Sequence, residues 1–332
     1  MKKLIAAAVA SSMTAFAMAD ISITGDAKYE YDLTDNNGTK TTTANTEAHI
    51  NFTGKSGDTT AVAKFQLVEQ GAAADATNAD GDFDMEDVYI TTSVAGVGIK
   101  AGNYASGTSG LAGEIEEGGR SNGKVMLSYK LGDINVYAGN GGDSADLAGN
   151  ANAADGGMNN NMFAGASVTV GGQTVQVKKN SEVLNSFGIK GSVGGVSYRY
   201  ETQDHDTNGD ASYGEVSASM NGITVQYATL DADSAAGLTE TDSAVFALES
   251  ANYANSDGQS QVAVSTTVDG NKITVKSGSV EKGLDATTDK DYTQLSVSRA
   301  LASGATAVVT YTDQDMATGD QTNLEIELNV KF

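Results

Sequence analysis

Apolar and polar residues alternate along much of the chain, and this pattern predicts β-strands. From Ile21 to Leu33 the odd positions are apolar or small, whereas the even positions are polar or charged. The C-terminal residues 324–332 repeat the alternation, with apolar side chains at the even positions. Side chains point to opposite faces along a strand, so each run has one apolar and one polar face. Both runs match the ~9–11 residues with which a tilted strand crosses a bilayer.

Eight pairs of such segments lie between these two runs, each pair joined by a short turn. Gly171-Gly172 and Asn221-Gly222 are examples of turn sequences that supply the positive φ required in tight hairpins. The tight turns occupy alternate junctions, and most of the other junctions are longer and polar, as in 70–81, 104–123, 141–161, 231–258 and 314–321. Short turns at one rim and long loops at the other are typical of transmembrane β-barrels, whose closed sheet satisfies every backbone group in lipid.

The number of strands depends on one segment. One first strand, eight hairpins and one last strand give 18, an even number as in bacterial barrels. Residues 162–179 can also be interpreted as a hairpin inside an extracellular loop, and this interpretation leaves 16 strands. The alternation within the segment fits both interpretations.

The N-terminal residues predict a secretory signal peptide. Met1-Lys2-Lys3 is charged, residues 4–16 are apolar or small, and Ala17-Met18-Ala19 fits an A-x-A cleavage site. The apolar run is too short to span the ~30 Å of hydrocarbon in a bilayer. We therefore assign residues 1–19 to a signal peptide and 20–332 to one barrel domain.

Composition excludes several function classes. The chain has no cysteine, which excludes disulfides and thiolate metal sites. Its formal net charge of −23 argues against nucleic-acid binding, which needs a basic face. The two histidines, His49 and His205, offer little basis for a catalytic site, so we predict that the protein is not an enzyme.

Several short motifs resemble those of the trimeric general porins of Gram-negative outer membranes. They are the opening 21–27, the segment 86–90, the segment 120–125 and, most specifically, the terminal Phe332 after alternating apolar residues. The resemblance covers the mature chain and implies a homotrimer in the outer membrane, in contact with lipid and lipopolysaccharide. It also implies that Phe332 is an assembly signal read by the barrel assembly machinery. The family norm is an all-β antiparallel barrel of 16 strands with short periplasmic turns. We take 16 strands as the prediction and 18 as the alternative.

The width of the predicted barrel indicates a channel function. A barrel of ~16–18 strands is too wide for side chains to fill and leaves an aqueous channel. The resemblance implies passive diffusion of small hydrophilic solutes and ions, with the third outer loop, 104–123, folded inward as a constriction. Acids facing bases there would be nearly balanced, and acidic vestibules raise the local cation concentration, so a weak cation preference is expected. The predicted constriction comprises Glu114, Glu116, Glu117 and Arg120 with the wall residues Lys28, His49, Lys64 and Lys100.

One acidic stretch matches the calcium-loop pattern D-x-[DN]-x-[DN]-G-x5-E. Its flanks read as strands rather than helices, so the alternative is an acidic extracellular loop in which Asp, Asn and Gly form turns. No other cofactor is predicted. An alternative function for the whole chain is a structural or adhesive barrel whose acidic loops bind divalent cations or neighbouring lipopolysaccharide. The candidate Ca²⁺ ligands are Asp204, Asp206, Asn208, Asp210 and Glu215.

Overall fold

The computed structural model describes nine segments of the mature chain, and the predicted signal peptide, 1–19, lies outside them. Within these segments the regular structure is entirely β-strand. None of the described residues belongs to a helix with the length and apolar character needed to span a membrane. The described residues are 20–70, 82–105, 120–140, 162–180, 184–205, 209–232, 256–283, 290–316 and 319–332.

The strands follow one another along the chain as hairpins. Asn221, Ala95 and Asp269 adopt positive φ in the turns, as do most of the turn glycines, because this conformation reverses the chain in two residues. The strands are β1 (Asp20–Asn36), β2 (Thr39–Ser56), β3 (Thr59–Gln70), β4 (Asp82–Val94), β5 (Val97–Ala105), β6 (Arg120–Leu131), β7 (Ile134–Asn140), β8 (Met162–Val170), β9 (Gln173–Asn180), β10 (Leu184–Val193), β11 (Val196–His205), β12 (Gly209–Met220), β13 (Ile223–Ala232), β14 (Ser256–Val268), β15 (Asn271–Gly283), β16 (Lys290–Ala300), β17 (Ala305–Met316) and β18 (Gly319–Lys331).

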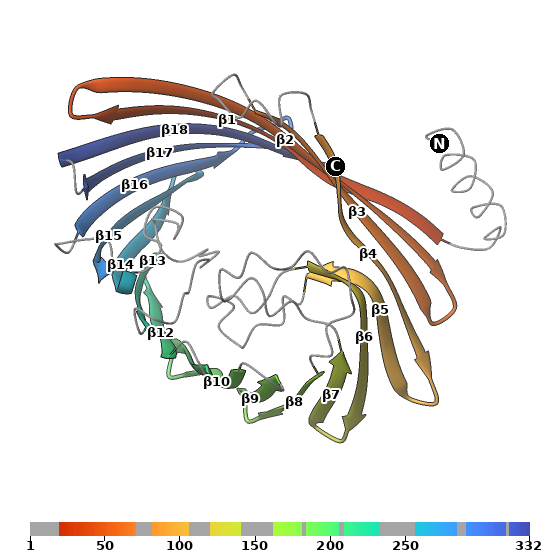
Figure 1. The fold of residues 1–332 in the computed structure, drawn as a ribbon. Coiled ribbons are helices and arrows are strands. Elements are labelled where there is room, and N and C mark those ends of the chain that lie inside the picture. Colours follow the sequence, from red (N-terminus) through yellow and green to blue (C-terminus); the bar gives the residue numbers. More distant parts are fainter. Residues whose placement is uncertain are drawn as a thin grey trace.

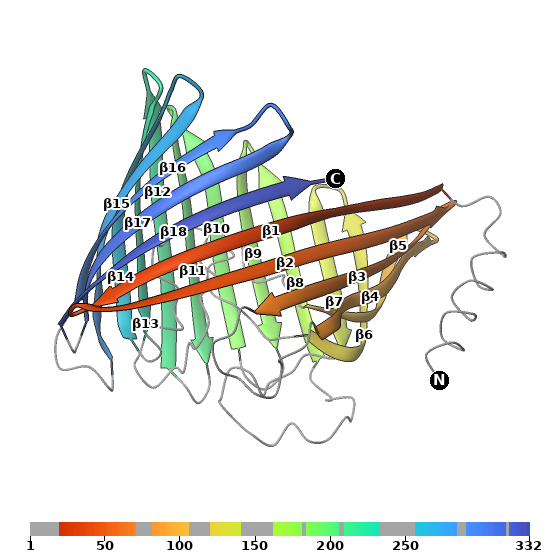
Figure 2. The same cartoon turned by 90° about the horizontal axis from the view of Figure 1, so that it is seen from above.

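All the strands belong to one closed antiparallel sheet, shown end-on in Figure 1. Each strand pairs with the next along the chain, and β1 pairs with β18 from Asp26↔Lys331 to Asn36↔Gln321. Backbone hydrogen bonds of 2.8 and 2.9 Å between Gly25 and Phe332 extend this closing seam to the last residue. Figure 2 shows tight turns of the hairpins between β10 and β17 along one rim of the barrel.

The described residues form an 18-stranded sheet, so the prediction of 16 is wrong and the alternative is confirmed. β8 pairs with β7 from Ile134↔Val168 to Asn140↔Met162, and β9 pairs with β10 from Leu184↔Asn180 to Lys190↔Thr174. A hairpin lying inside a loop would leave both of its outer edges unpaired. Here those edges complete the wall, because a barrel that crosses lipid needs a backbone partner for every strand edge.

The alternation of side chains divides the barrel into an apolar outer face and a polar inner face. Ile326 pairs with Tyr31 on one side and Val309 on the other, and all three side chains are exposed or half-buried on the outer face. The neighbouring Glu325 pairs with Asp32 and Thr310 on the inner face. The outer face can therefore contact hydrocarbon, and the inner face bears the charged groups described below.

Candidate channel lining

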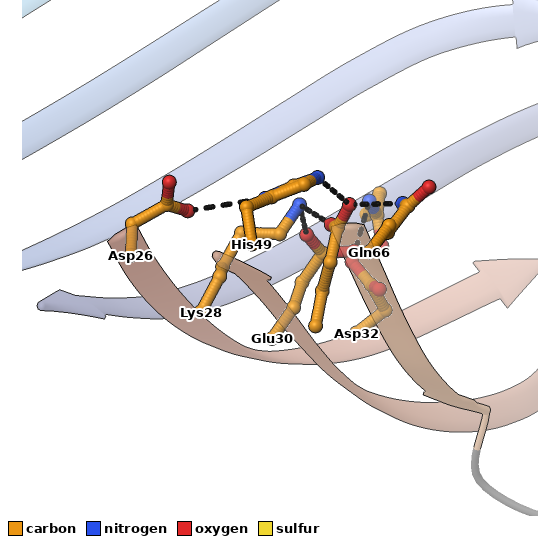
Figure 3. Close-up of polar contacts among 8 residues, drawn as sticks. Asp26, Lys28, Glu30, Asp32, His49 and Gln66 are labelled. Atoms are coloured by element: carbon orange, nitrogen blue, oxygen red, sulfur yellow. Dashed lines mark hydrogen bonds and ion pairs between the residues drawn. The ribbon is translucent and has the colours of Figure 1, made fainter. Parts of the chain in front are cut away.

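Charged side chains gather on the inner face where the barrel closes, and Figure 3 shows those of β1 and β2. Lys28 Nζ lies 3.0 Å from Glu30 Oε2 and 3.4 Å from Glu47 Oε2. His49 Nδ1 lies 3.3 Å from Asp26 Oδ2, and its Nε2 lies 3.1 Å from Glu47 Oε1. Both basic side chains are thus held between carboxylates of the same wall, because the β1–β2 register sets Lys28 opposite Glu47 and Asp26 opposite His49.

The acids in this region outnumber the bases. Glu30, Glu325 and Glu327 come from the two strands of the seam, and their carboxylate oxygens lie within 4.8 Å of one another. Asp32 accepts a hydrogen bond of 3.5 Å from Asn323 Nδ2. We call Asp26, Glu30, Asp32, Glu47, Glu325 and Glu327 the seam acids. Glu30, Glu325 and Glu327 are close enough to share one cation, and the whole group makes this side of the lumen negative.

A second group of charged and aromatic side chains lies on β3 to β6, where two β-bulges shift the strand register. Lys64 Nζ lies 3.3 Å from Asp87 Oδ2, next to the register shift between Lys64 and Phe65. Lys100 Nζ lies 4.1 Å from the Tyr89 ring centroid and 3.9 Å from that of Tyr104, within range of a cation–π interaction. Gly102, with φ 145°, marks the second shift and leaves space for the Tyr89 backbone and side chain. The tyrosines therefore hold Lys100 against the wall.

The inner wall farther from the seam is mainly basic. Lys124 Nζ is fully buried and donates a 3.1 Å hydrogen bond to the Tyr104 carbonyl. Arg199 donates from Nε to Glu215 Oε2 over 2.7 Å, and Glu215 also accepts bonds from Tyr213 and Gln226. The register places further cations on this inner face of β6 to β11, namely Lys130, Lys178 and Lys190. The charges of the lumen are therefore segregated, with acids at the seam and cations mainly on the opposite wall.

The predicted constriction residues fall into two groups. Lys28, His49, Lys64 and Lys100 all occupy the inner face, and the first three lie within 4.0 Å of wall carboxylates. Arg120 begins β6, but its side chain lies outside the described part of the structure. The loop acids Glu114, Glu116 and Glu117 also lie outside the described residues, so their position at the constriction stays a prediction.

The acidic partners of these bases were not among the predicted site residues. Glu30 lies two residues after Lys28, and Glu47 lies two residues before His49, so alternation alone places them on the same face. That signal was available from the sequence. The pairing of Lys64 with Asp87 is harder to predict from the sequence. The bulge next to Lys64 shifts the register, so counting residues back from the loop between β3 and β4 gives the wrong partner.

Three of the predicted calcium ligands, Asp204, Asp210 and Glu215, are among the described residues, and these three do not converge on one ion. Asp204 and Asp210 pair across the β11–β12 hairpin and are exposed on the outer parity of these strands. Glu215 lies farther down β12 on the inner face, where Arg199 holds it. The prediction that Glu215 shares an ion with the two aspartates is therefore wrong, since opposite faces of a one-layer sheet separate them. Asp206 and Asn208 lie outside the described residues.

Comparison with known proteins identifies the fold. No family model and no curated protein matches the chain. The structure is similar to OccK8 (OprE) of Pseudomonas aeruginosa, with a TM-score of 0.63, 12% identity and coverage of 94% of this chain and 98% of that chain. It is similar to P. aeruginosa OccK2 (OpdF) in complex with glucuronate, with a TM-score of 0.66, 11% identity and coverage of 94% and 98%. It is also similar to a mutant of Rh. blastica porin, with a TM-score of 0.54, 13% identity and coverage of 94% of this chain and 100% of that chain. The chain thus has the fold of the outer-membrane porins.

Proposed function

We propose that this chain forms a water-filled channel in the outer membrane of a Gram-negative bacterium, through which small hydrophilic solutes and ions diffuse passively. The observation that carries the proposal is the closed 18-strand sheet with an exposed apolar outer face and a charged inner face. Barrels of about this size are wide enough to enclose an aqueous channel. The likeness to solved porins supports the same function.

The proposal includes a homotrimer in contact with outer-membrane lipid and lipopolysaccharide, inserted by the barrel assembly machinery. Its support is the family resemblance, together with the exposed Phe332 side chain at the end of the last strand. No catalytic role is part of the proposal.

Single-channel recording of the purified protein in planar bilayers tests the proposal directly. We expect discrete conductance steps that scale with the salt concentration, because bulk ions would carry the current through an open lumen. A folded, inserted barrel that gives no steps would favour the structural or adhesive alternative.

The proposed channel has a weak cation preference. The seam acids attract cations, whereas the cations of the opposite wall reduce the effect, so the summed field of the lumen is small. Salt screens such fields over ~8 Å at physiological ionic strength. The preference should therefore be largest at low salt and fade as the salt concentration rises.

Replacing the loop acids Glu114, Glu116 and Glu117 together by glutamine is expected to shift the reversal potential toward anions, with conductance of the same order. The physical reason is that charge at the narrowest point acts over the shortest, least screened distance. The measurement is the zero-current potential across a salt gradient. An unchanged cation preference would show that 104–123 is not the constriction.

Replacing the seam acids Glu30, Glu325 and Glu327 together by glutamine is expected to shift the reversal potential in the same direction, most strongly at low salt. These carboxylates lie within 4.8 Å of one another, so their potentials add at one place on the wall. The same recording compares the two triple variants, which remove equal formal charge. If the seam variant kept the wild-type reversal potential at low salt, Glu30, Glu325 and Glu327 would have no part in selectivity.

A further inference from the structure

A hollow of about 610 Å³ lies on the inner wall near the short-turn rim, over β4 to β9. This volume is within the range of small-molecule sites. Its lining is rich in groups that form hydrogen bonds, and it includes one ammonium group but no carboxylate. The residues on which the argument depends are Ser128, Lys130, Asn135, Tyr137, Ser167 and Gln176.

The strand register explains why these side chains converge. Lys130, Asn135, Ser167 and Gln176 are successive cross-strand partners, so they form one row over β6 to β9. The next row away from the rim contains Ser128 paired with Tyr137. Two adjacent polar rows therefore border the same hollow.

Two glycines of the second row make room for the hollow. Gly165 is the cross-strand partner of Tyr137, and a Cβ atom at Gly165 would overlap the Tyr137 ring. The ring therefore lies across Gly165, and Tyr137 lines the hollow. Gly98 is the partner of Ser128, and a Cβ atom there would lie 2.6 Å from Ser128 Oγ. The absence of side chains at both positions deepens the wall.

These groups fit a hydroxylated carboxylate. The amides of Asn135 and Gln176 can each donate and accept, as hydroxyl groups of a solute require. The half-buried Tyr137 ring lines the hollow and can pack against the C–H groups of a sugar ring, while its hydroxyl accepts a 3.5 Å hydrogen bond from Gln176 Nε2. This bond leaves Gln176 Oε1 and its second N–H for the solute. Lys130 can pair with a carboxylate through a charge-assisted hydrogen bond. A cationic solute would find no opposite charge among the lining residues.

We propose that this hollow is a binding subsite for hydroxylated carboxylates of monosaccharide size, such as a hexuronate. Lys130 holds the carboxylate, Tyr137 stacks on the ring, and Asn135 and Gln176 hydrogen-bond the hydroxyl groups. The inference rests on the proposed function, because solute reaches the hollow through an open lumen. A subsite for anions is compatible with a weak cation preference of the channel. The reversal potential depends on all the charges along the lumen, whereas solute binding depends on the groups at one place on its wall.

The test uses sodium glucuronate as the probe and blockage of single-channel current as the readout, in the full barrel. For Lys130→Gln we expect the half-blocking concentration to rise about tenfold, which corresponds to ~1.4 kcal/mol. The matched control is Lys190→Gln, which removes the same charge from an exposed inner-face lysine of β10 that does not line the hollow. We expect glucuronate to block the control variant at the same concentration as wild type. We expect glucose to block the wild-type channel more weakly than glucuronate does.

A second pair of variants tests the aromatic contact. Tyr137→Phe keeps the ring and should stay within about twofold of wild type, whereas Tyr137→Ser should weaken the blockage by about tenfold. If Tyr137→Ser fails to assemble, the comparison of Lys130→Gln with Lys190→Gln decides the question, because both lysines are exposed and neither substitution adds volume.

The outcomes separate the two levels of the proposal. A wild-type barrel without conductance would overturn the proposed function itself. Open wild-type channels without glucuronate blockage, or with equal blockage in Lys130→Gln and Lys190→Gln, would overturn the subsite and leave the channel intact.

Discussion

Replacing Ile326 by arginine is expected to lower the free energy of unfolding of the barrel in lipid by ~2–4 kcal/mol. The Ile326 side chain is 43% exposed on the outer face, in the middle part of β18, where the barrel meets hydrocarbon. A guanidinium at that position must give up its hydration or distort the bilayer around it. A urea series on barrels refolded into vesicles, read from the folded band on unheated gels, measures the change.

Glu325→Arg is the matched control for this prediction. The two positions are adjacent on one strand and receive the same new side chain, but Glu325 faces the lumen near Glu30 and Glu327. An arginine there stays in water and meets opposite charges, so its effect should be small. Equal destabilisation by Ile326→Arg and Glu325→Arg would contradict the assignment of the two faces.

Replacing Gly25 by valine is expected to prevent stable closure of the barrel. A Cβ atom at Gly25 would lie 2.7 Å from Phe332 Cζ and would overlap the carbonyl oxygen of His49. Gly25 also exchanges two backbone hydrogen bonds with Phe332, so relief of the overlap would pull the closing seam apart. Overpacking of this kind costs ~1–3 kcal/mol, and here it falls on the last backbone pair of the closing seam. The measurement is the fraction of protein that reaches the folded band after refolding.

Gly54→Val is the matched control for the glycine, because a Cβ atom at Gly54 has nothing within 4 Å. It lies opposite Ile21 on the outer face of β2 and should fold like wild type. Deletion of Phe332 removes the ring and both bonds, and it should slow insertion while leaving the conductance of assembled channels unchanged. Normal assembly of Gly25→Val would show that barrel closure does not require the Phe332 ring to pack on Gly25.

Alternation along each strand is a local property, and for this reason it could be read from the sequence. The outer face at Ile21, Ile23 and Ile326 and the inner face at Lys28 and Glu325 follow from counting by twos. The tight turns could be read for the same reason, since their Gly and Asn residues report backbone conformation directly. These local signals were sufficient to predict an antiparallel barrel with short turns at one rim.

The strand count needed information that is not local. The alternation in 162–179 is the same whether the hairpin stands in a loop or in the wall. Only the pairing of β8 with β7 and of β9 with β10 distinguishes the two cases. The count of 18 taken directly from the pattern was correct, whereas the family norm of 16 led to the wrong choice.

The calcium motif failed for a related reason. A spacing pattern specifies positions along the chain, but its ligands converge only if the intervening residues fold into a loop. Here β12 continues as a strand through Asp210 to Glu215, and it carries these side chains to opposite faces. The strand geometry therefore excludes a shared ion even though the sequence fits the pattern.

The orientation of each side chain toward lipid or lumen follows from the sequence alone, because it depends only on the alternation within one strand. The tertiary structure decided which charges meet. Glu30 meets Glu325 and Glu327 only because the first and last strands close on each other. Lys64 meets Asp87 because the β3–β4 register pairs them, next to a bulge. The hollow beside Lys130 likewise arises from the register of β5 to β9, which aligns Gly98 and Gly165 with larger partners. These contacts depend on relations between strands, which the sequence of any single strand does not contain.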